Sequence, residues 1–259
     1  MLREIVEEVI HIAVDAGERI LEVYGDEASF DVEFKADESP LTRADKAAND
    51  LIVGRLGKMD IGYPIISEES KEVPYPERKS YRRFWLVDPL DGTKEFIKRN
   101  GEFTVNIALI EDGHPILGVV HVPVSSETHY GAEGLGAFRR YDGIDTILKA
   151  SHYSESDTGL RVVCSRSHIN EDTQAYIDRF EQPLKVSKGS SLKFLLIASG
   201  KADVYPRMGP TMEWDTGAAQ CVLEQSGGEV LQADTMEPLT YNKESLLNPF
   251  FIARAALRQ

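Results

Sequence analysis

Apolar residues recur at helical spacing at the start of the chain. Over 2–25 they return every three or four residues, and Gly25 stands where a helix commonly ends. After the polar segment 26–41, Thr42-Arg43-Ala44-Asp45 has the form of a capping box, which opens a helix. The pattern predicts amphipathic helices over 2–25 and 42–59.

Short apolar runs replace the helical period after residue 60. They are rich in branched and aromatic side chains and are bounded by turn residues, which is typical of strands. Asp112-Gly113 separates two of these runs and predicts a two-residue hairpin. The expected strands are 65–66, 84–87, 105–110, 116–122 and a pair within 128–140.

Beyond residue 160, strand-like and helix-like runs alternate, which is typical of layered α/β structure. The polar segment 141–159 has no clear period and is the candidate boundary between two parts. We expect an N-terminal α+β part, 1–150, and a C-terminal α/β part, 151–259. The expected strands of the second part are 161–164, 184–186, 202–205, 229–231 and 250–253, and its expected helices are 171–180, 191–198 and 215–225.

Composition and charge restrict the class of protein. The chain has 259 residues, of which 42% are hydrophobic and 28% charged, values typical of a globular protein. Acidic residues outnumber basic ones by 43 to 29, and the net charge of -14 disfavours binding to nucleic acid phosphates. A small molecule is therefore the expected partner, and the oligomeric state stays open.

The sequence shows no targeting or membrane segment. Acidic residues interrupt the apolar positions near the N-terminus, and nowhere do about 18 apolar residues run together. Cys164 and Cys221 each lie in an apolar stretch and are expected to be free thiols, as in a reducing compartment. The expected location is the cytoplasm, with peripheral attachment to the inner membrane left open.

The most informative stretch is WLVDPLDGTKEF, which begins at Trp85. An apolar strand delivers Asp88 at its end, and Asp91 follows three residues later. Two carboxylates this close raise each other's pKa unless a cation lies between them, and carboxylates are ligands of hard divalent ions. Gly92 lets backbone approach a ligand, and a helix that begins at Thr93 presents N–H groups to phosphate oxygens. Taken alone, the stretch is more typical of a tight turn whose aspartates cap backbone groups.

Two further acidic motifs follow apolar runs. Glu68 comes two residues after the end of the predicted strand 65–66, and Asp215 stands at the start of a predicted helix. Separately, the first is typical of a solvated loop and the second of a helix N-cap. Together with Asp88 and Asp91, they have one shared explanation, which is a pair of magnesium ions that bind a phosphate ester. Such ions supply the positive field that an acidic protein lacks.

The segments around Glu68, 88–93 and 214–215 resemble the signature motifs of the inositol monophosphatase superfamily of magnesium-dependent, lithium-sensitive phosphatases, across nearly the whole chain. Segment 86–106, which includes 94–100, resembles its 3′(2′),5′-bisphosphate nucleotidase branch, and segment 189–194 supports the same branch. The resemblance implies the layered α/β/α/β/α sandwich of the inositol monophosphatase and fructose-1,6-bisphosphatase type. It also implies a magnesium cofactor bound by Glu68, Asp88, Asp91, Asp215 and the carbonyl oxygen of Leu90.

The same resemblance implies that Asp45 hydrogen-bonds Thr93 to orient the attacking water, while Glu68 acts through the metal that activates this water. Asp45 is also the last residue of the capping box, so the two roles compete for its carboxylate. A helix that opens at Ser190-Ser191 would present free N–H groups, with Lys193 in its first turn, as a cradle for the 5′-phosphate or the ribose. The alternatives are a helix cap and a solvated lysine. The expected substrate-binding residues are Gly92, Thr93, Ser190, Lys193 and Asp215.

The implied activity is removal of the 3′-phosphate of adenosine 3′,5′-bisphosphate, which gives AMP and phosphate and connects the protein to sulfur metabolism. An inositol monophosphatase or a sugar bisphosphatase with the same metal site is the first alternative. A phosphate-ligand sensor that has lost catalysis is the second, and the intact acidic set with Thr93 argues against it.

Overall fold

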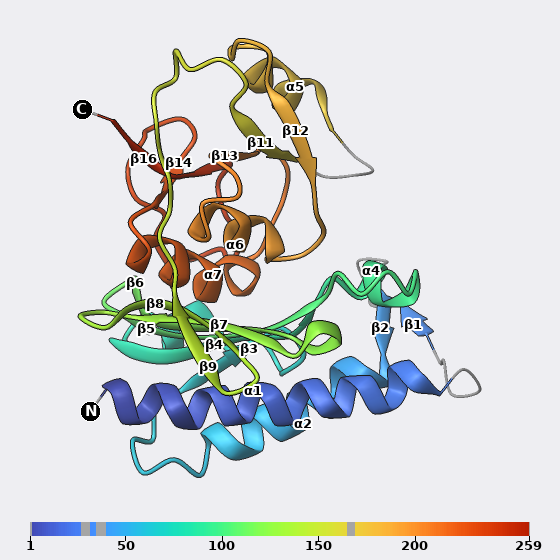
Figure 1. The fold of residues 1–259 in the computed structure, drawn as a ribbon. Coiled ribbons are helices and arrows are strands. Elements are labelled where there is room, and N and C mark those ends of the chain that lie inside the picture. Colours follow the sequence, from blue (N-terminus) through green and yellow to red (C-terminus); the bar gives the residue numbers. More distant parts are fainter. Residues whose placement is uncertain (1, 27–31, 35–39, 165–168, 259) are drawn as a thin grey trace.

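The computed structural model describes residues 2–26, 32–34, 40–164 and 169–258, and they form five layers (Figure 1). Helices α1 (Leu2–Gly25) and α2 (Arg43–Leu56) make the first layer, and α6 (Leu192–Ala198) with α7 (Glu213–Gln225) makes the third. Helix α5 (Glu171–Ile177) makes the fifth. The second and fourth layers are mixed sheets, so the predicted α/β sandwich is confirmed.

The larger sheet has seven strands, and only its first pair, β3 and β4, is parallel. In order across the sheet they are β3 (Ile65–Ser67), β4 (Arg83–Asp91), β5 (Thr104–Glu111), β6 (His114–Val122), β7 (Glu127–Ala132), β8 (Gly136–Tyr141) and β9 (Ile144–Ile147). The five-stranded sheet follows the order β12 (Leu184–Ser187), β11 (Arg161–Cys164), β13 (Val204–Arg207), β15 (Phe251–Arg254) and β14 (Glu229–Gln232).

Short elements complete the described chain. Two antiparallel strands, β1 (Val32–Phe34) and β2 (Pro40–Thr42), precede α2, and two parallel strands, β10 (His152–Tyr153) and β16 (Ala256–Leu257), pair near the C-terminus. Helices α3 (Tyr75–Arg78) and α4 (Thr93–Ile97) flank β4, and a 3₁₀ turn, Pro123–Ser125, follows β6.

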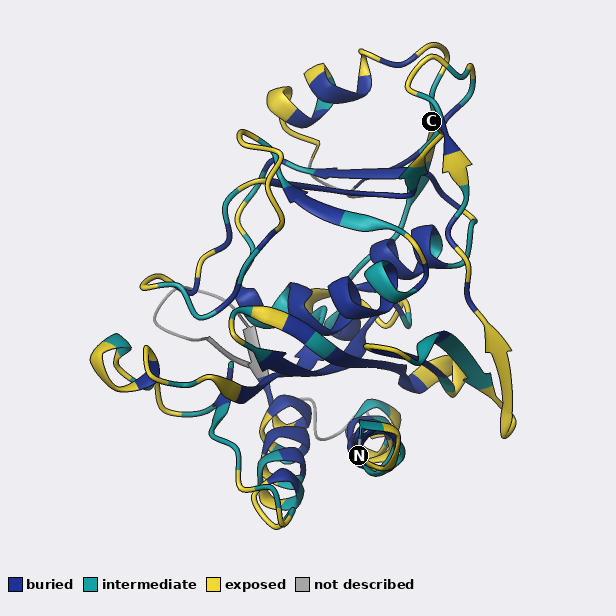
Figure 2. Ribbon diagram, turned by 90° about the vertical axis from the view of Figure 1, so that its left-hand side faces the viewer, coloured by how far each residue is buried: buried dark blue, intermediate teal, exposed yellow. Residues whose placement is uncertain are grey.

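The larger sheet is covered on both faces, which explains its nearly continuous apolar strands. Along β4, Phe84 and Leu86 pack into the core shared with α7 and the smaller sheet. Trp85 and Val87 pack into the core beneath α1 and α2. Figure 2 shows most of these strands and the helix above them as buried.

Helix α7 lies directly on β6. A Cβ placed on Gly118 would lie 2.2 Å from the carbonyl oxygen of Ala218 and 2.8 Å from Cys221 Cβ, so only glycine allows this approach. Because α7 carries Asp215 in its first turn, this contact fixes the height of that carboxylate above the sheet.

Most predicted elements are confirmed, including the hairpin, where Asp112 and Gly113 both have positive φ, 47° and 83°. The sequence predicts no strand within 141–159, but β9 and β10 lie there. Strand β1 lies within the polar segment 26–41, and β2 begins there and ends at Thr42. The division into 1–150 and 151–259 stays a prediction.

Both cysteines, Cys164 and Cys221, are buried free thiols, as predicted. Among the described residues, no helix combines the length and the apolar character needed to span a bilayer.

Candidate metal and phosphate site

Two parallel strands bring the first acidic residues together. Glu68 follows β3, and its N–H donates to the carbonyl oxygen of Val87 in β4 (3.1 Å), next to Asp88. Asp88 is 1% exposed, and its Oδ1 accepts the N–H of Leu90 at 3.0 Å. Adjacent strand ends therefore place Glu68 beside Asp88, as the sequence predicts.

A bulge in β4 places Asp88 and Asp91 on the same face of the sheet. Asp88 pairs with Asn106 and Asp91 with Thr104, so three steps on β4 oppose two on β5. Without the extra residue, side chains three positions apart would point to opposite faces. Leu90 packs into the core beneath α1 and α2, which leaves both aspartates on the α7 side.

Asp215 joins this cluster from α7. Carboxylate oxygens of Glu68, Asp88 and Asp215 lie within 4.8 Å of one another. The helix begins at Glu213, so Asp215 is its third residue and not the N-cap that the sequence suggests, and its Oδ2 accepts the N–H of Met212 at 2.9 Å. Burial raises the pKa of Asp215 to about 8, and the nearby Asp91 adds to the shift.

The donor set fits a hard divalent cation. Burial, followed by the charges of Glu68 and Asp91, raises the pKa of Asp88 well above its usual value. Three carboxylates that cannot all ionise without a counter-charge, and that can all contribute oxygen, are what such an ion requires. The described residues therefore support the predicted roles of Glu68, Asp88 and Asp215 as ligands.

Asp91 has hydrogen-bond partners that differ from those of the three clustered carboxylates. Its Oδ2 accepts hydrogen bonds from Ser190 Oγ (2.7 Å), Ser191 N–H (2.6 Å) and Ser191 Oγ (2.6 Å), which belong to the loop before α6. It stands outside the group of three, although its charge raises the pKa of both Asp88 and Asp215. Its role as a ligand, like that of the Leu90 carbonyl oxygen, stays a prediction.

Asp45 uses its two oxygens for two partners. Oδ2 accepts Thr42 N–H at 2.8 Å and Thr42 Oγ1 at 2.5 Å, which completes the capping box of α2. Oδ1 accepts the hydroxyl of Thr93 at 3.3 Å. The expected competition between the two roles is therefore wrong. Burial raises the pKa of Asp45, and the Thr42 hydrogen bonds oppose this effect.

Gly92 makes the turn from β4 into α4. Its φ is 95°, and a Cβ there would lie 3.0 Å from the Glu102 carbonyl oxygen and 3.3 Å from Ser190 Cβ. Helix α4 begins at Thr93, as the sequence predicts.

A cavity of about 540 Å³ borders this site, and its lining includes Asp215 of the three clustered carboxylates but not Glu68 or Asp88. Its lining includes Asp91, Gly92, Ser190, Lys193 and Asp215. The lining continues past these predicted site residues to Asn170, Arg207, Met208 and Phe251.

Lys193 is 9% exposed, so the alternative of a solvated lysine is wrong. Its Nζ donates to the Ser190 carbonyl oxygen at 2.7 Å and lies 5.5 Å from the centre of the Tyr205 ring. Burial lowers its pKa to about 8. The expected anion cradle of free N–H groups at 190–191 is also wrong, because α6 begins at Leu192 and Ser191 N–H donates to Asp91.

Sequence reasoning missed the residues that hold the 190–191 loop. Asn106 Nδ2 donates to Ser191 Oγ at 2.7 Å, and Thr104 Oγ1 lies 2.7 Å from Ser190 Oγ. Glu102 accepts Gly189 N–H at 2.8 Å. The only signal in the sequence is that Thr104 and Asn106 are polar positions within an apolar strand.

The fold and this acidic site belong to a known class of phosphatases. The model of the inositol monophosphatase family matches residues 1–254, and the chain belongs to this family.

Individual proteins are also similar to this chain in sequence and in structure. The 3′(2′),5′-bisphosphate nucleotidase CysQ of Escherichia coli K12 is 44% identical over 246 residues, which cover 95% of this chain and 97% of the relative. The crystal structure of CysQ from Bacteroides thetaiotaomicron superposes with a TM-score of 0.86 and 42% identity, covering 99% of this chain and 98% of the other. An inositol monophosphatase from Anabaena, with a TM-score of 0.73, 24% identity and coverage of 98% and 91%, shares the fold.

Proposed function

We propose that the protein is a 3′(2′),5′-bisphosphate nucleotidase that hydrolyses the 3′-phosphate of adenosine 3′,5′-bisphosphate to give AMP and phosphate. The observation that carries the proposal is the group of three carboxylates within 4.8 Å of one another, one of which, Asp215, lines a cavity of about 540 Å³. The nucleotidases at 44% identity support the choice of substrate.

Glu68, Asp88 and Asp215 hold magnesium, together with Asp91 and the carbonyl oxygen of Leu90. When bound, magnesium supplies a Lewis acid that neutralises charge on the phosphate and on the departing oxygen. Its small radius and oxygen preference suit a carboxylate site that also receives phosphate oxygens.

Thr93 and Asp45 position the attacking water. Because the Thr93 hydroxyl donates to Asp45 Oδ1, an oxygen lone pair of Thr93 remains directed for a water proton. Asp45 is fixed in turn by the Thr42 hydrogen bonds at its other oxygen. The chain thus holds the water in one orientation before reaction, which lowers the entropic part of the barrier.

Gly92, Ser190 and Lys193 contact the substrate. Gly92 allows the close approach of the phosphate to backbone, and Lys193 presents a partly desolvated ammonium group to the nucleotide. The protein acts in the cytoplasm, which suits its two free thiols. It takes part in sulfur metabolism, and lithium inhibits its activity.

The test is phosphate release from adenosine 3′,5′-bisphosphate, inositol 1-phosphate and fructose 1,6-bisphosphate, each with magnesium and with excess chelator. We expect the highest kcat/KM for the nucleotide, and we expect no phosphate release from any substrate in excess chelator. A preference for inositol 1-phosphate or the sugar would assign one of the other family activities. Binding of a phosphate ligand without turnover would assign a sensor.

A further inference from the structure

Basic side chains gather at the cavity of an acidic protein. The chain carries 29 Lys and Arg against 43 Asp and Glu. Among the charged residues that line the cavity, by contrast, basic residues outnumber acidic ones. The basic residues are Lys94, Lys98, Lys188, Lys193 and Arg207, and the acidic residues are Asp91, Glu95, Glu102 and Asp215. With Asp91 and Asp215 assigned to the metal, cations dominate the remaining wall, so this wall attracts an anion.

Three of these five cations already have partners. Lys188 Nζ lies 3.2 Å from Glu102 Oε1. Lys193 Nζ donates to the Ser190 carbonyl oxygen, and burial lowers its pKa, an effect that the charges of Asp91 and Glu95 oppose. Arg207 Nη2 donates to the Pro210 carbonyl oxygen at 2.9 Å, although the buried Nε of Arg207 has no hydrogen-bond partner among the described residues. The charge of Arg207 opposes the rise in the pKa of Asp215.

Lys94 and Lys98 are different. Both are exposed, and no ion pair or side-chain hydrogen bond is recorded for either among the residues that the structure describes. At about 100° per residue, positions four apart lie about 40° apart around a helix, so both lysines share one face of α4 and its C-cap.

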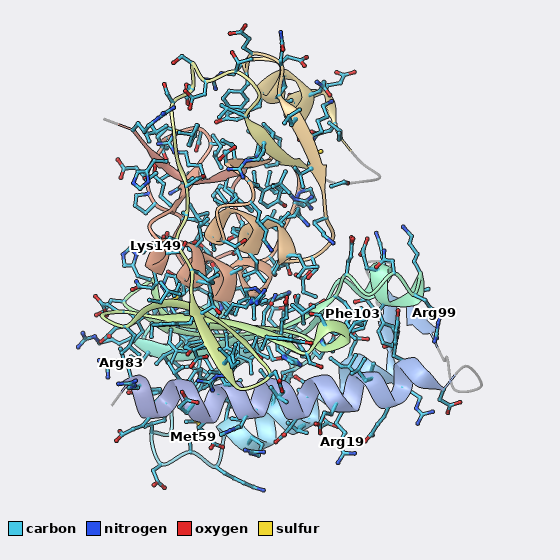
Figure 3. The ribbon with its side chains drawn as sticks, in the orientation of Figure 1. Arg19, Met59, Arg83, Arg99, Phe103 and Lys149 are labelled. Carbon is cyan, nitrogen blue, oxygen red and sulfur yellow. The ribbon has the colours of Figure 1, made fainter. Side chains whose placement is uncertain are left out.

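The opposite face of α4 is anchored. Phe96 is fully buried, and its ring centre lies 5.1 Å from that of Tyr24 and 5.3 Å from that of Phe103. It stands about 200° from Lys94 around the helix, so packing of the aromatic ring turns the two lysines towards the cavity. Figure 3 labels Phe103 and Arg99 beside this element.

We infer that Lys94 and Lys98 bind the second phosphate of the substrate, the one that is not cleaved. This inference rests on the proposed function, because it concerns the same cavity and the same bisphosphate. Lys94 follows Thr93 directly, so one short helix carries both the group that orients the water and the charge that selects the substrate. Lys193, buried beneath, is then left to the ribose side of the nucleotide.

The test compares Lys94→Gln/Lys98→Gln with the wild type on adenosine 3′,5′-bisphosphate and on adenosine 3′-monophosphate, which lacks the second phosphate. The control is Lys79→Gln/Lys149→Gln, which removes the same charge from two exposed lysines outside the cavity lining. Figure 3 shows Lys149 on the side of the molecule away from α4. Calorimetry with Ca²⁺ in place of Mg²⁺ measures the affinity for both nucleotides without relying on turnover.

For the cavity variant, we expect KM and the dissociation constant of the bisphosphate to rise about ten-fold, as for lost charge-assisted contacts at an exposed site, with kcat unchanged. The monophosphate should shift less than about two-fold, and added salt should weaken bisphosphate binding mainly in the wild type. Equal losses on both nucleotides, or none, would overturn the inference. A wild type that binds the bisphosphate through these lysines without hydrolysing it would instead reject the proposed function alone.

Discussion

The hydroxyl of Thr93 lies 3.3 Å from Asp45 Oδ1, which joins the first turn of α2 to the first residue of α4. The two residues are 48 positions apart in the chain. The sheet brings them together, because Thr93 follows β4, against which α2 packs. One carboxylate thus both caps a helix and holds the hydroxyl that we propose positions the attacking water.

Thr93→Val should lower kcat at least about 100-fold, because the valine cannot orient the water and misplacement of a reacting group has a cost of this size. The magnesium concentration that gives half-maximal activity should change little, since the hydroxyl is assigned to water. Steady-state kinetics over a magnesium series measures both quantities. Thr93→Ser keeps the hydroxyl and should retain most activity, and wild-type rates in Thr93→Val would refute the assignment.

Asp45→Asn should lower kcat while costing about 1 kcal/mol of unfolding free energy, the usual value of a helix cap. Its control is Thr42→Ala, which removes the Oγ1 bond to Asp45 Oδ2 and leaves Thr93 untouched. This variant should lose similar stability and keep its turnover. Denaturant unfolding and phosphate release separate the two effects, and equal turnover losses in both variants would make Asp45 purely structural.

Metal removal should destabilise the protein in a pH-dependent way. The pKa of Asp215 is about 8 in the folded chain and 3.8 as its ordinary value, so the metal-free folded state binds the extra proton between these limits. Stability in chelator should therefore fall as pH rises from about 4 to about 8. Magnesium displaces this proton, so its affinity should rise over the same range.

Melting temperatures with magnesium and with chelator, at about pH 6 and about pH 8.5, measure this effect. The difference between the two conditions should be larger at the higher pH. Asp215→Asn should flatten the pH dependence in chelator. A metal-induced shift that is the same at both pH values would contradict the proton competition.

Gly118→Ala should destabilise the fold by about 1–3 kcal/mol, as overpacking of a core does. Its Cβ would lie 2.2 Å from the Ala218 carbonyl oxygen, so α7 must move and carry Asp215 with it. Magnesium affinity should therefore fall together with stability. Gly54→Ala is the matched control, because no atom lies within 4 Å of that Cβ and alanine favours the interior of α2. An unchanged melting temperature in Gly118→Ala would mean that α7 is not seated as described.

The acidic residues of the site can be predicted from the sequence, but their arrangement in space is predicted less well. Asp88 and Asp91 are visible as a motif, but the bulge that turns both to one face depends on pairing with β5, which a local pattern does not encode. The sequence predicts a helix that begins at 215, two residues after the observed start of α7, because Asp215 resembles a helix cap. In the structure, Met212 precedes Glu213, the first residue of α7, and the backbone N–H of Met212 donates a hydrogen bond to the Asp215 carboxylate.

Polar contacts between residues far apart in the sequence are the features of the structure that the sequence predicts least well. Ser190 and Ser191 were read as a phosphate cradle, yet both donate to Asp91, about 100 positions earlier in the chain. Strand β9 was missed because all four of its residues are exposed, so burial leaves no apolar period. Backbone pairing with β8 fixes this strand, together with the Asp145 carboxylate, which accepts Nε and Nη2 of Arg140 at 2.8 Å each.

The last prediction concerns Lys193, whose substitution should affect nucleotides and spare other phosphate esters. Lys193→Ala should raise KM for adenosine 3′,5′-bisphosphate by roughly ten- to a hundred-fold, the value of one charge-assisted contact. Because the buried Nζ is assigned to the ribose side, adenosine 3′-monophosphate should lose as much. Inositol 1-phosphate, tested as a substrate or as a competing ligand, should be hardly affected.

Packing must be separated from charge, since Lys193 lies against the Tyr205 ring and alanine would leave a gap there. Lys193→Met fills the space without the charge, so it should keep the melting temperature of the wild type and still show the full KM effect. Recovery of nucleotide KM in Lys193→Met would make the role one of packing. Equal losses on inositol 1-phosphate would move Lys193 to the metal centre, whereas a loss confined to the bisphosphate would move it to the second phosphate.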